Sequence, residues 1–453
     1  MSRDLERALH YHQISYWQPA IDAYDKVLAE HPDNLQVLAR RAENYVMLGR
    51  FAEAQRDLTL AAPALHNSAY WVNLGLSIEC QGNYEAALIA YDQAIVIDPD
   101  NKYAHFNKGV CLERDLGLVG EGMPHFRHAL AIDPEFHGAM GGVSFHQLKV
   151  GDFIEGWKSF EFRTHDKNTT RLPGLPFNGA ETDDTLILVC EQGIGDVLQF
   201  CRYALIAAVN GQKTAIYTSP AFKPLLSSLH PSIKILTSPE EVVEPYQWAH
   251  MMSMPMHMGT TVETIPSAKR YLRSSKAKRD YWKTKIGEHA DTFNIGICWH
   301  PGHPQNPHVA GRVIPLRMFA EMAEIPNVKL FCLQKEEAAK EVLDVGFPVI
   351  DLGGDPVVKQ DLFMDNAAIM ENLDLVISTD SAVLHMAGAC GAKVFAALPK
   401  GSCWRWLVDR DDSPWYPSMK LFRQKEIHDW AEVFARITDE VRSLAKQKEV
   451  SHG

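Results

Sequence analysis

Hydrophobic positions follow two different patterns along the chain, and the pattern changes near residue 165. Before that point, small and large apolar residues recur every three or four positions, which predicts packed amphipathic helices. From residue 185 onward, short continuous apolar runs alternate with helical segments. Continuous runs of this length are typical of buried parallel strands, so the second part predicts an α/β fold. The stretch 166–184 has neither pattern and is interpreted as a linker.

A repeat of about 34 residues organises the first part. With Ser68 as the first position of a unit, Trp71, Gly75, Tyr91 and Pro99 fall on the pattern of paired antiparallel helices that defines the tetratricopeptide repeat. The first part therefore resembles a tetratricopeptide array of four units, followed by a degenerate capping unit at 145–160, over residues 1–165. The unit after the one at Ser68 carries one extra residue near 116–120. Such an array holds a peptide or protein partner on its concave face, or serves as a scaffold or self-association surface.

The second part predicts two α/β halves, at 185–288 and 289–445. Strands are expected at 185–190, 214–218 and 233–236 in the first half, with an apolar methionine-rich loop at 248–258. In the second half they are expected at 293–299, 328–333, 348–352, 373–378 and 393–398. Ligands in such sheets lie beyond the carboxyl ends of the strands, so two facing halves predict a cleft.

The strand at 373–377 leads directly into a turn and a helix with phosphate-binding character. Asp380 and Ser381 are good N-cap residues, and His385 follows Ser381 by four positions on the same helix face. A helix N-terminus offers free N–H groups and partial positive charge. The hydroxyls of Thr379 and Ser381 and the His385 imidazole could join those groups around a diphosphate. Alternatively, Ser381 only caps the helix and His385 packs.

Four stretches carry a resemblance to a known family: Glu191-Gln-Gly-Ile-Gly-Asp196, Leu333-Gln-Lys335, Ser378-Thr-Asp-Ser-Ala-Val-Leu-His385 and the Trp/Pro segment from Trp404 to Pro417. With the repeats, they resemble bacterial tetratricopeptide-repeat glycosyltransferases. The catalytic part is similar to the ADP-heptose:lipopolysaccharide heptosyltransferases of glycosyltransferase family 9, and the layout is similar to protein O-GlcNAc transferase. The resemblance implies the GT-B fold, with an acceptor-side Rossmann-like half and a nucleotide-sugar-binding Rossmann-like half.

The same resemblance implies an activity and its participants. These are a metal-independent, inverting glycosyltransferase of the hexosyl or heptosyl class, a nucleotide-diphospho-sugar as co-substrate, and no cofactor. The acceptor would be a protein or glycan recruited by the repeats, and the chain could form homo-oligomers. Donor sugar, base and acceptor stay open.

The resemblance also assigns roles to single residues. Asp196 would be the general base, in a turn where Gly193 and Gly195 let the backbone approach a ligand; the alternative is an N-cap. Arg312 and Lys335 would stabilise the leaving diphosphate, although a solvated loop arginine is the alternative for Arg312.

Further roles follow at the donor end. Thr379, Asp380, Ser381 and His385 would complete the phosphate site. Glu336 would reach ribose hydroxyls or simply begin a helix. Trp404 would stack on a sugar or base, or hold its loop against the core.

Asp196, Arg312, Asp380 and His385 together favour an active enzyme, but two departures from the family pattern keep a second interpretation open. Relatives carry Trp-Ser-Gly where this chain has Trp299-His-Pro-Gly302, and Val313 replaces a common serine. The alternative function is therefore a non-catalytic interaction protein with a degenerate transferase domain.

A metal site is not expected. The group His300, His303 and His308 lacks a carboxylate or cysteine at ligand spacing, and proline interrupts it. The Asp409-Arg-Asp411 triplet spells a metal-binding D-x-D but follows no suitable strand, so it is interpreted as structural.

Composition and charge limit the partners and the cellular compartment that the sequence predicts. The net charge of −12 argues against a general nucleic-acid binder. No apolar run approaches the roughly 18 residues of a membrane span, and the start of the chain has no signal-peptide core. The 8 cysteines form no C-x-x-C pair. These features predict a cytoplasmic protein with free thiols.

Overall fold

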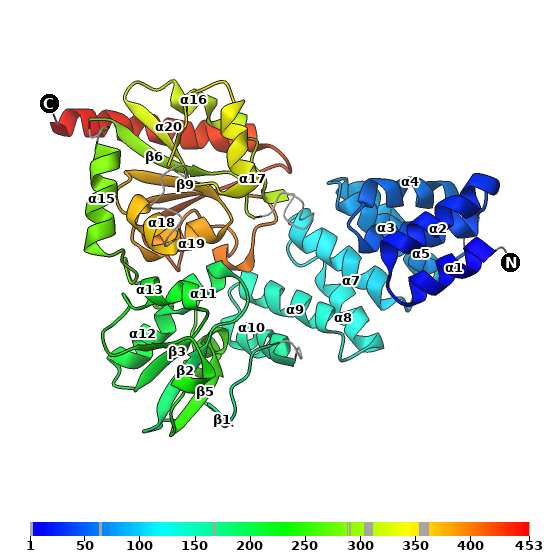
Figure 1. Cartoon of the computed structure of the whole chain (residues 1–453), viewed down its shortest axis with the longest axis horizontal. Helices are drawn as coiled ribbons and strands as arrows, with labels where there is room; N and C mark the ends of the chain where they lie inside the picture. Colours follow the sequence, from blue (N-terminus) through cyan, green and yellow to red (C-terminus); the bar gives the residue numbers. More distant parts are fainter. Residues whose placement is uncertain are drawn as a thin grey trace. The chain divides into compact units, whose positions relative to one another are not determined.

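The computed structural model describes residues 3–62, 66–165, 169–287, 289, 291–302, 311–352 and 362–452 (Figure 1). Contacts divide this chain into a first unit that runs to His146 and a second that starts at Gln147. The first unit is helical and the second contains two parallel sheets. No helix in the described ranges is long and apolar enough to cross a bilayer.

Paired helices build the first unit, and small residues allow their close approach. A Cβ on Gly75 would lie 2.5 Å from the Tyr91 ring, and one on Gly109 would lie 2.7 Å from the Phe126 ring. These are the same two positions of consecutive repeats. The helices are α1 (Arg3–Gln13), α2 (Trp17–Glu30), α3 (Leu35–Met47), α4 (Phe51–Ala61), α5 (Ser68–Glu79), α6 (Tyr84–Ile97), α7 (Lys102–Val110), α8 (Met123–Ile132) and α9 (His137–Lys149).

A one-turn π-helix, η2 (Cys111–Asp115), extends α7. The backbone N–H of Leu116 donates to the carbonyl of Cys111 at 2.9 Å, five residues back. The wider turn takes up an additional residue, next to the place where the sequence predicts one.

The second unit opens with α10 (Phe153–Phe160) and the 3₁₀ helix η3 (Glu161–His165). The repeat pattern predicts that residues 153–160 end the repeats, but the packing partners of α10 lie in the second unit. The Trp157 indole N–H donates to the Thr260 carbonyl at 3.1 Å, and its ring contacts the rings of Phe200 and Trp404. The predicted domain boundaries at 165, 184 and 288 stay predictions.

The first sheet contains five parallel strands in the order β1-β5-β2-β3-β4. The predicted strands are confirmed, but the expected loop at 248–258 is wrong at its start, where the residues up to His250 belong to a strand. The strands are β1 (Leu175–Pro176), β2 (Thr185–Val189), β3 (Thr214–Tyr217), β4 (Lys234–Leu236) and β5 (Tyr246–His250). Helices α11 (Ile194–Phe200), α12 (Arg202–Val209), α13 (Lys223–Leu226) and α14 (Met254–His257) accompany them.

The second sheet contains six parallel strands in the order β11-β10-β9-β6-β7-β8. The chain starts at β6, moves outward to β8, and returns to β9 on the other side of β6. The sequence did not predict β11. The strands are β6 (Phe293–Cys298), β7 (Val328–Cys332), β8 (Ile350–Asp351), β9 (Leu375–Thr379), β10 (Val394–Leu398) and β11 (Met419–Arg423).

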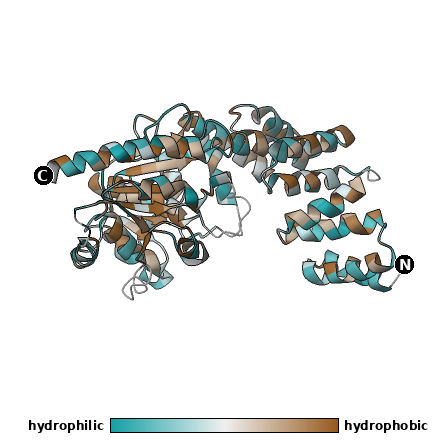
Figure 2. Cartoon of the chain, turned by 90° about the horizontal axis from the view of Figure 1, so that it is seen from above, coloured by the Kyte–Doolittle hydropathy of each residue, from teal (hydrophilic) through white to brown (hydrophobic). Residues whose placement is uncertain are grey.

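Helices cover both faces of this sheet. Phe434 and Ile437 of α20 (Trp430–His452) pack on one face with Phe319 of η8 (Leu316–Phe319), and α16 (Ala320–Ala323) follows η8. Leu384 of α19 (Ala382–Ala389) and Met370 of α18 (Leu362–Met370) pack on the other. Figure 2 shows hydrophobic and hydrophilic residues alternating along α20, as expected of a helix with one face on a sheet. The charged helix α15 (Lys276–Gly287) joins the two halves.

Candidate functional site

The carboxyl ends of β6, β7 and β9 meet where the strand order of the second sheet reverses. The Gln334 amide oxygen, beyond β7, accepts from the backbone N–H of His300 at 3.0 Å and from the Cys298 thiol at 3.3 Å. The hydroxyls of Ser378 and Ser381, around the end of β9, lie 3.1 Å apart. Such reversal points are the usual ligand positions of open α/β sheets.

Four of the predicted phosphate-end residues come together here. The Ser381 hydroxyl accepts from the Val383 N–H at 3.3 Å, so Ser381 caps α19 as predicted. Arg312 donates from Nη1 to the Asp380 carbonyl at 3.1 Å, and the Thr379 hydroxyl donates to the Arg312 carbonyl. These hydrogen bonds hold the Arg312 guanidinium beside the N-terminus of the eight-residue helix α19. Backbone N–H groups and the helix dipole favour an anion at that position.

The imidazole of His385 is buried on α19. Its Nδ1 lies 2.9 Å from the Tyr416 hydroxyl, and its ring stacks on Trp406 at 5.6 Å between centroids. Burial lowers the pKa of His385 well below its usual value, and the nearby guanidiniums of Arg405 and Arg202 lower it further. These are the packing contacts of the alternative interpretation. The predicted phosphate contact of His385 stays a prediction.

Asp196 sits in the predicted Gly-rich turn at the start of α11. Its Oδ2 accepts from the Gly193 N–H at 2.9 Å, which closes the turn as an N-terminal cap. Its Oδ1 is ion-paired with Nη2 of Arg405. Gly195, in the same turn, lies against His385 of α19, so α11 and α19 pack closely. The turn of the first half therefore lies beside the N-terminus of α19, the predicted phosphate end.

Arg405 is a candidate site residue that the sequence pattern did not predict. It lies in the 3₁₀ helix η11 (Trp404–Trp406) of the second half, and its Nε donates to the Gln199 amide oxygen of α11 at 2.7 Å. Its guanidinium lies over the Trp404 ring at 4.3 Å. Burial opposes its charge, yet attraction to Asp196 raises the pKa of Arg405. A lone arginine between two tryptophans gives no sequence signal for a partner 209 positions away.

Trp404 and Lys335 have different surroundings. Trp404 is 4% exposed, and its ring contacts Trp157 and Trp415 in an aromatic cluster. Its predicted stacking on a ligand stays a prediction. Lys335 lies half-buried beyond β7, and burial lowers its pKa. Helix α17 (Glu336–Ala339) starts at Glu336, whose side chain lies outside the described residues.

The segment that departs from the family pattern is partly described. The His300 side chain is buried, and its Nδ1 lies 2.7 Å from the Gly302 carbonyl. His303 and His308, the other two members of the three-histidine group, lie outside the described residues. In the D-x-D triplet, the Asp411 carbonyl accepts from the Leu421 N–H of β11 at 2.7 Å, a backbone contact of a structural kind.

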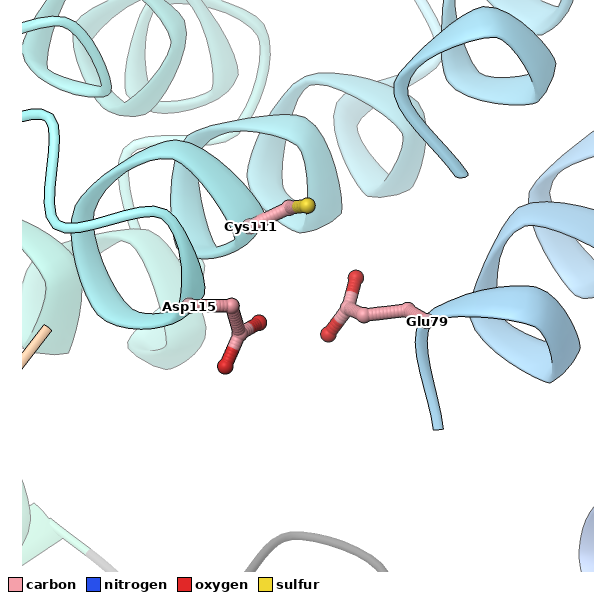
Figure 3. A group of neighbouring side chains, drawn as sticks. All are labelled: Glu79, Cys111 and Asp115. Carbon is pink, nitrogen blue, oxygen red and sulfur yellow. The ribbon is translucent and has the colours of Figure 1, made fainter. Parts of the chain in front are cut away.

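One group of metal-ligand type is found among the described residues, and it lies in the first unit. Glu79, Cys111 and Asp115 place one ligand atom each within 4.8 Å of one another, and their side chains point toward one another (Figure 3). Arg114 already supplies a cation there, donating to Glu79 at 2.8 Å and to Asp115 at 2.8 Å. Burial and the Asp115 carboxylate raise the pKa of Glu79 to about 7. A metal ion would have to compete with the guanidinium for both carboxylates.

Comparison with known proteins supports the TPR repeats, and the relative that matches most of the chain is only distantly similar. A sequence model of the TPR repeat matches residues 81–115. Protein FlbA of Caulobacter vibrioides is 23% identical over 446 residues, which cover 91% of this chain and 74% of FlbA.

Similar solved structures include two that each cover 36% of this chain. The crystal structure of MamA covers 36% of this chain and 94% of MamA, with 20% identity and a TM-score of 0.32. The structure of YrrB, a TPR protein with an unusual peptide-binding site, covers 36% of this chain and 86% of YrrB, with 18% identity and a TM-score of 0.32. The chain therefore contains TPR repeats, followed by an α/β region with parallel sheets.

Proposed function

We propose that this protein is a metal-independent, inverting glycosyltransferase of the GT-B type. It would move a sugar from a nucleotide-diphospho-sugar to a protein or glycan that the repeats recruit. The observation that carries the proposal is the packing of α11 on α19, with Gly195 against His385. This packing sets a carboxylate, Asp196, beside a helix N-terminus equipped with Arg312 and Ser381. A base and an anion site side by side are what a single displacement at an anomeric carbon requires.

In this mechanism Asp196 takes the proton of the acceptor hydroxyl. The acceptor oxygen then bonds to the anomeric carbon while the bond from that carbon to the diphosphate breaks, which inverts the configuration. Negative charge collects on the leaving diphosphate, where Arg312 and the N–H groups of α19 stabilise it. A carboxylate has about four lone-pair positions. The contacts from Gly193 and Arg405 therefore leave room on Asp196 for an incoming hydroxyl.

The order of the second sheet supports the nucleotide-binding part of the proposal. Numbered along the chain, its strands follow the sequence 6-5-4-1-2-3, which is the dinucleotide-binding order of a doubly wound sheet. All 8 cysteines are free thiols, which fits the expected cytoplasmic location.

A thermal-shift panel tests the donor site. The full chain would be heated with ADP, UDP, GDP, CMP and TDP, as wild type and as Arg312→Ala. A ligand that binds only the folded state at 100 times its Kd adds about 2.7 kcal/mol of stability. We expect one nucleotide to raise the Tm of the wild type and not of Arg312→Ala. Arg317→Ala, an exposed arginine in η8, is the matched control and should respond like wild type. No shift with any nucleotide at millimolar concentration would overturn the proposal.

The alternative is a non-catalytic TPR interaction protein with a degenerate transferase domain. One observation favours it: both carboxylate oxygens of Asp196 already have partners, as a purely structural capping residue would. Asp196→Asn separates the two functions. An enzyme should lose about 100- to 10,000-fold in kcat while nucleotide binding persists. An unchanged rate of nucleotide release in Asp196→Asn, with the fold intact by circular dichroism, would contradict a catalytic Asp196.

A further inference from the structure

Arg423, the last residue of β11, is a half-buried cation whose hydrogen-bond partners among the described residues are neutral. Its Nη1 donates to the Ser402 hydroxyl and its Nη2 to the Trp406 carbonyl. Its Nε is buried and has no hydrogen-bond partner. No carboxylate in the described ranges lies within ion-pair distance of this guanidinium. The other arginines of this region differ, because Arg405 pairs with Asp196 and Arg410 pairs with Asp412.

The nearby carboxylates do not fully compensate the desolvation of the Arg423 guanidinium. Burial lowers the pKa of Arg423 to about 10, and attraction to Asp409 and Asp380 only partly opposes the effect. The side chain therefore stays charged at neutral pH. Buried charges in proteins are normally paired, because desolvation costs several kcal/mol per ion. An arginine fork also presents two parallel N–H bonds that suit a phosphate.

Arg423 lies at the same end of the second sheet as the proposed donor site. β11 ends at the same sheet edge as β9 and β10, and all three strands are parallel. β11 lies two strands from β9, or about 10 Å at the usual spacing. Lys400, in the loop after β10, is half-buried, and its ion-pair partner among the described residues is the exposed Glu426, at 3.6 Å. With Arg312 at the N-terminus of α19, Arg423 and Lys400 thus place further positive charge at the same end of the sheet, toward its outer strand β11.

We propose that Arg423, supported by Ser402 and Lys400, forms an oxyanion subsite that binds phosphate oxygens of the nucleotide donor. The inference rests on the proposed function for the source of the phosphate, since a free or acceptor-borne phosphate offers the same oxygens. The guanidinium would exchange the Ser402 hydroxyl or the Trp406 carbonyl for a charged acceptor. Its Nε could join as a second donor.

Binding measurements on the full chain test the subsite. Inorganic pyrophosphate, the nucleoside diphosphate chosen by the thermal-shift panel, and the matching nucleoside would be titrated calorimetrically. We expect Arg423→Gln to weaken both phosphate-bearing ligands about 10- to 100-fold, with the nucleoside unaffected. Arg423→Lys should be intermediate, because it keeps the charge without the fork. Arg410→Gln, in the same segment but half-exposed and paired with Asp412, is the control and should bind like wild type.

The outcomes separate this inference from the proposed function. Equal affinity of wild type and Arg423→Gln for the nucleoside diphosphate would overturn the subsite and leave the transferase proposal standing. Binding of pyrophosphate through Arg423 without binding of any nucleotide would keep the subsite and overturn the nucleotide donor as its source.

A second measurement needs no variant and so does not depend on folding. Wild-type protein would be treated with phenylglyoxal, with and without pyrophosphate, and the modified arginines located by mass spectrometry. Saturating pyrophosphate should protect Arg423 and leave Arg410 reactive. Modification of Arg423 at an unchanged rate would overturn the subsite.

Discussion

At the scale of single residues, the two glycines of the Asp196 turn have different tasks. A Cβ on Gly195 would lie 2.7 Å from Cδ2 of the buried His385, a distance that real Cβ atoms do not reach without movement. A Cβ on Gly193 would meet only Oδ2 of Asp196, at 3.4 Å. The backbone of Gly193, with φ of −86°, suits any residue. Close packing of α11 on α19 therefore depends on Gly195.

This difference predicts opposite results for two alanine variants. Gly195→Ala should destabilise the second unit by about 1–3 kcal/mol, because the added methyl overpacks the helix contact. Gly193→Ala should change the free energy of unfolding by less than about 0.5 kcal/mol. Urea denaturation of both variants and wild type is the measurement. Equal stability of the two variants would show that the α11–α19 contact is looser than described.

His385 predicts a pH dependence of stability. Its folded pKa lies below the unfolded value near 6.5, so the unfolded state binds more protons between the two values. Stability should therefore fall as the pH drops below about 6.5, by up to about 1.4 kcal/mol per pH unit from this residue. His385→Gln should flatten the slope between pH 7.5 and 5, measured by urea denaturation. His10→Gln, exposed on α1, is the control. Parallel slopes for wild type and His385→Gln would contradict a neutral buried imidazole.

Residues whose structure is set locally could be predicted from the sequence, and residues paired over long distances could not. Ser381 caps α19 because its hydroxyl meets an N–H two residues away, a contact that any N-cap sequence favours. The Arg405–Asp196 pair spans 209 positions and depends on how two halves pack. Arg423 was not predicted as a site residue because its strand, Met419–Arg423, includes two charged residues and lacks the continuous apolar run of its neighbours.

At the scale of elements, α10 has the sequence pattern of a TPR helix but packs as part of the α/β unit. Its Gly156, Trp157 and Phe160 continue the small-and-aromatic spacing of the repeats. Helical periodicity shows which face is buried, but it does not show which partner buries it. The partners are rings of the α/β unit, and Trp157 is only 2% exposed. The strand β5 was likewise not predicted, because methionines follow directly after His250 and the whole stretch resembles an apolar loop.

The packing of α10 predicts where the chain can be divided. A fragment of residues 147–453 keeps α10 and should unfold cooperatively. A fragment of residues 166–453 loses the buried Phe153, Trp157 and Phe160, and removing even one such ring costs about 3–5 kcal/mol. It also loses Arg163, which pairs with the buried Glu191 at 2.9 Å. The summed loss approaches the whole stability of a domain, about 5–15 kcal/mol.

Size-exclusion chromatography and thermal denaturation of the two fragments provide the measurement. The shorter fragment should aggregate or melt without a cooperative transition. A cooperative transition of both fragments at the same temperature would contradict the placement of α10 in the second unit.

At the scale of the whole molecule, the two units divide the proposed work. The described hydrophobic clusters of the α/β unit contain only residues from 148 onward. The repeats contribute their own small cluster around Val72, Ala94 and Ala104. The residues of the proposed nucleotide site all belong to the second unit, whereas the proposed recruitment of a partner belongs to the first. Donor chemistry and acceptor delivery should therefore be separable by removing the repeats.

The separation predicts a specific kinetic result for residues 147–453. The fragment should bind the donor nucleotide, and slowly hydrolyse the donor, as the full chain does, because those groups are all retained. Transfer to a protein acceptor should fall about 100- to 10,000-fold in kcat/KM, since a tethered acceptor gains that much from its effective concentration. Parallel assays of donor hydrolysis and protein labelling measure both. Equal labelling by fragment and full chain would show that the repeats do not deliver the acceptor. Absence of turnover from both, with partner capture by the full chain alone, would favour the scaffold function.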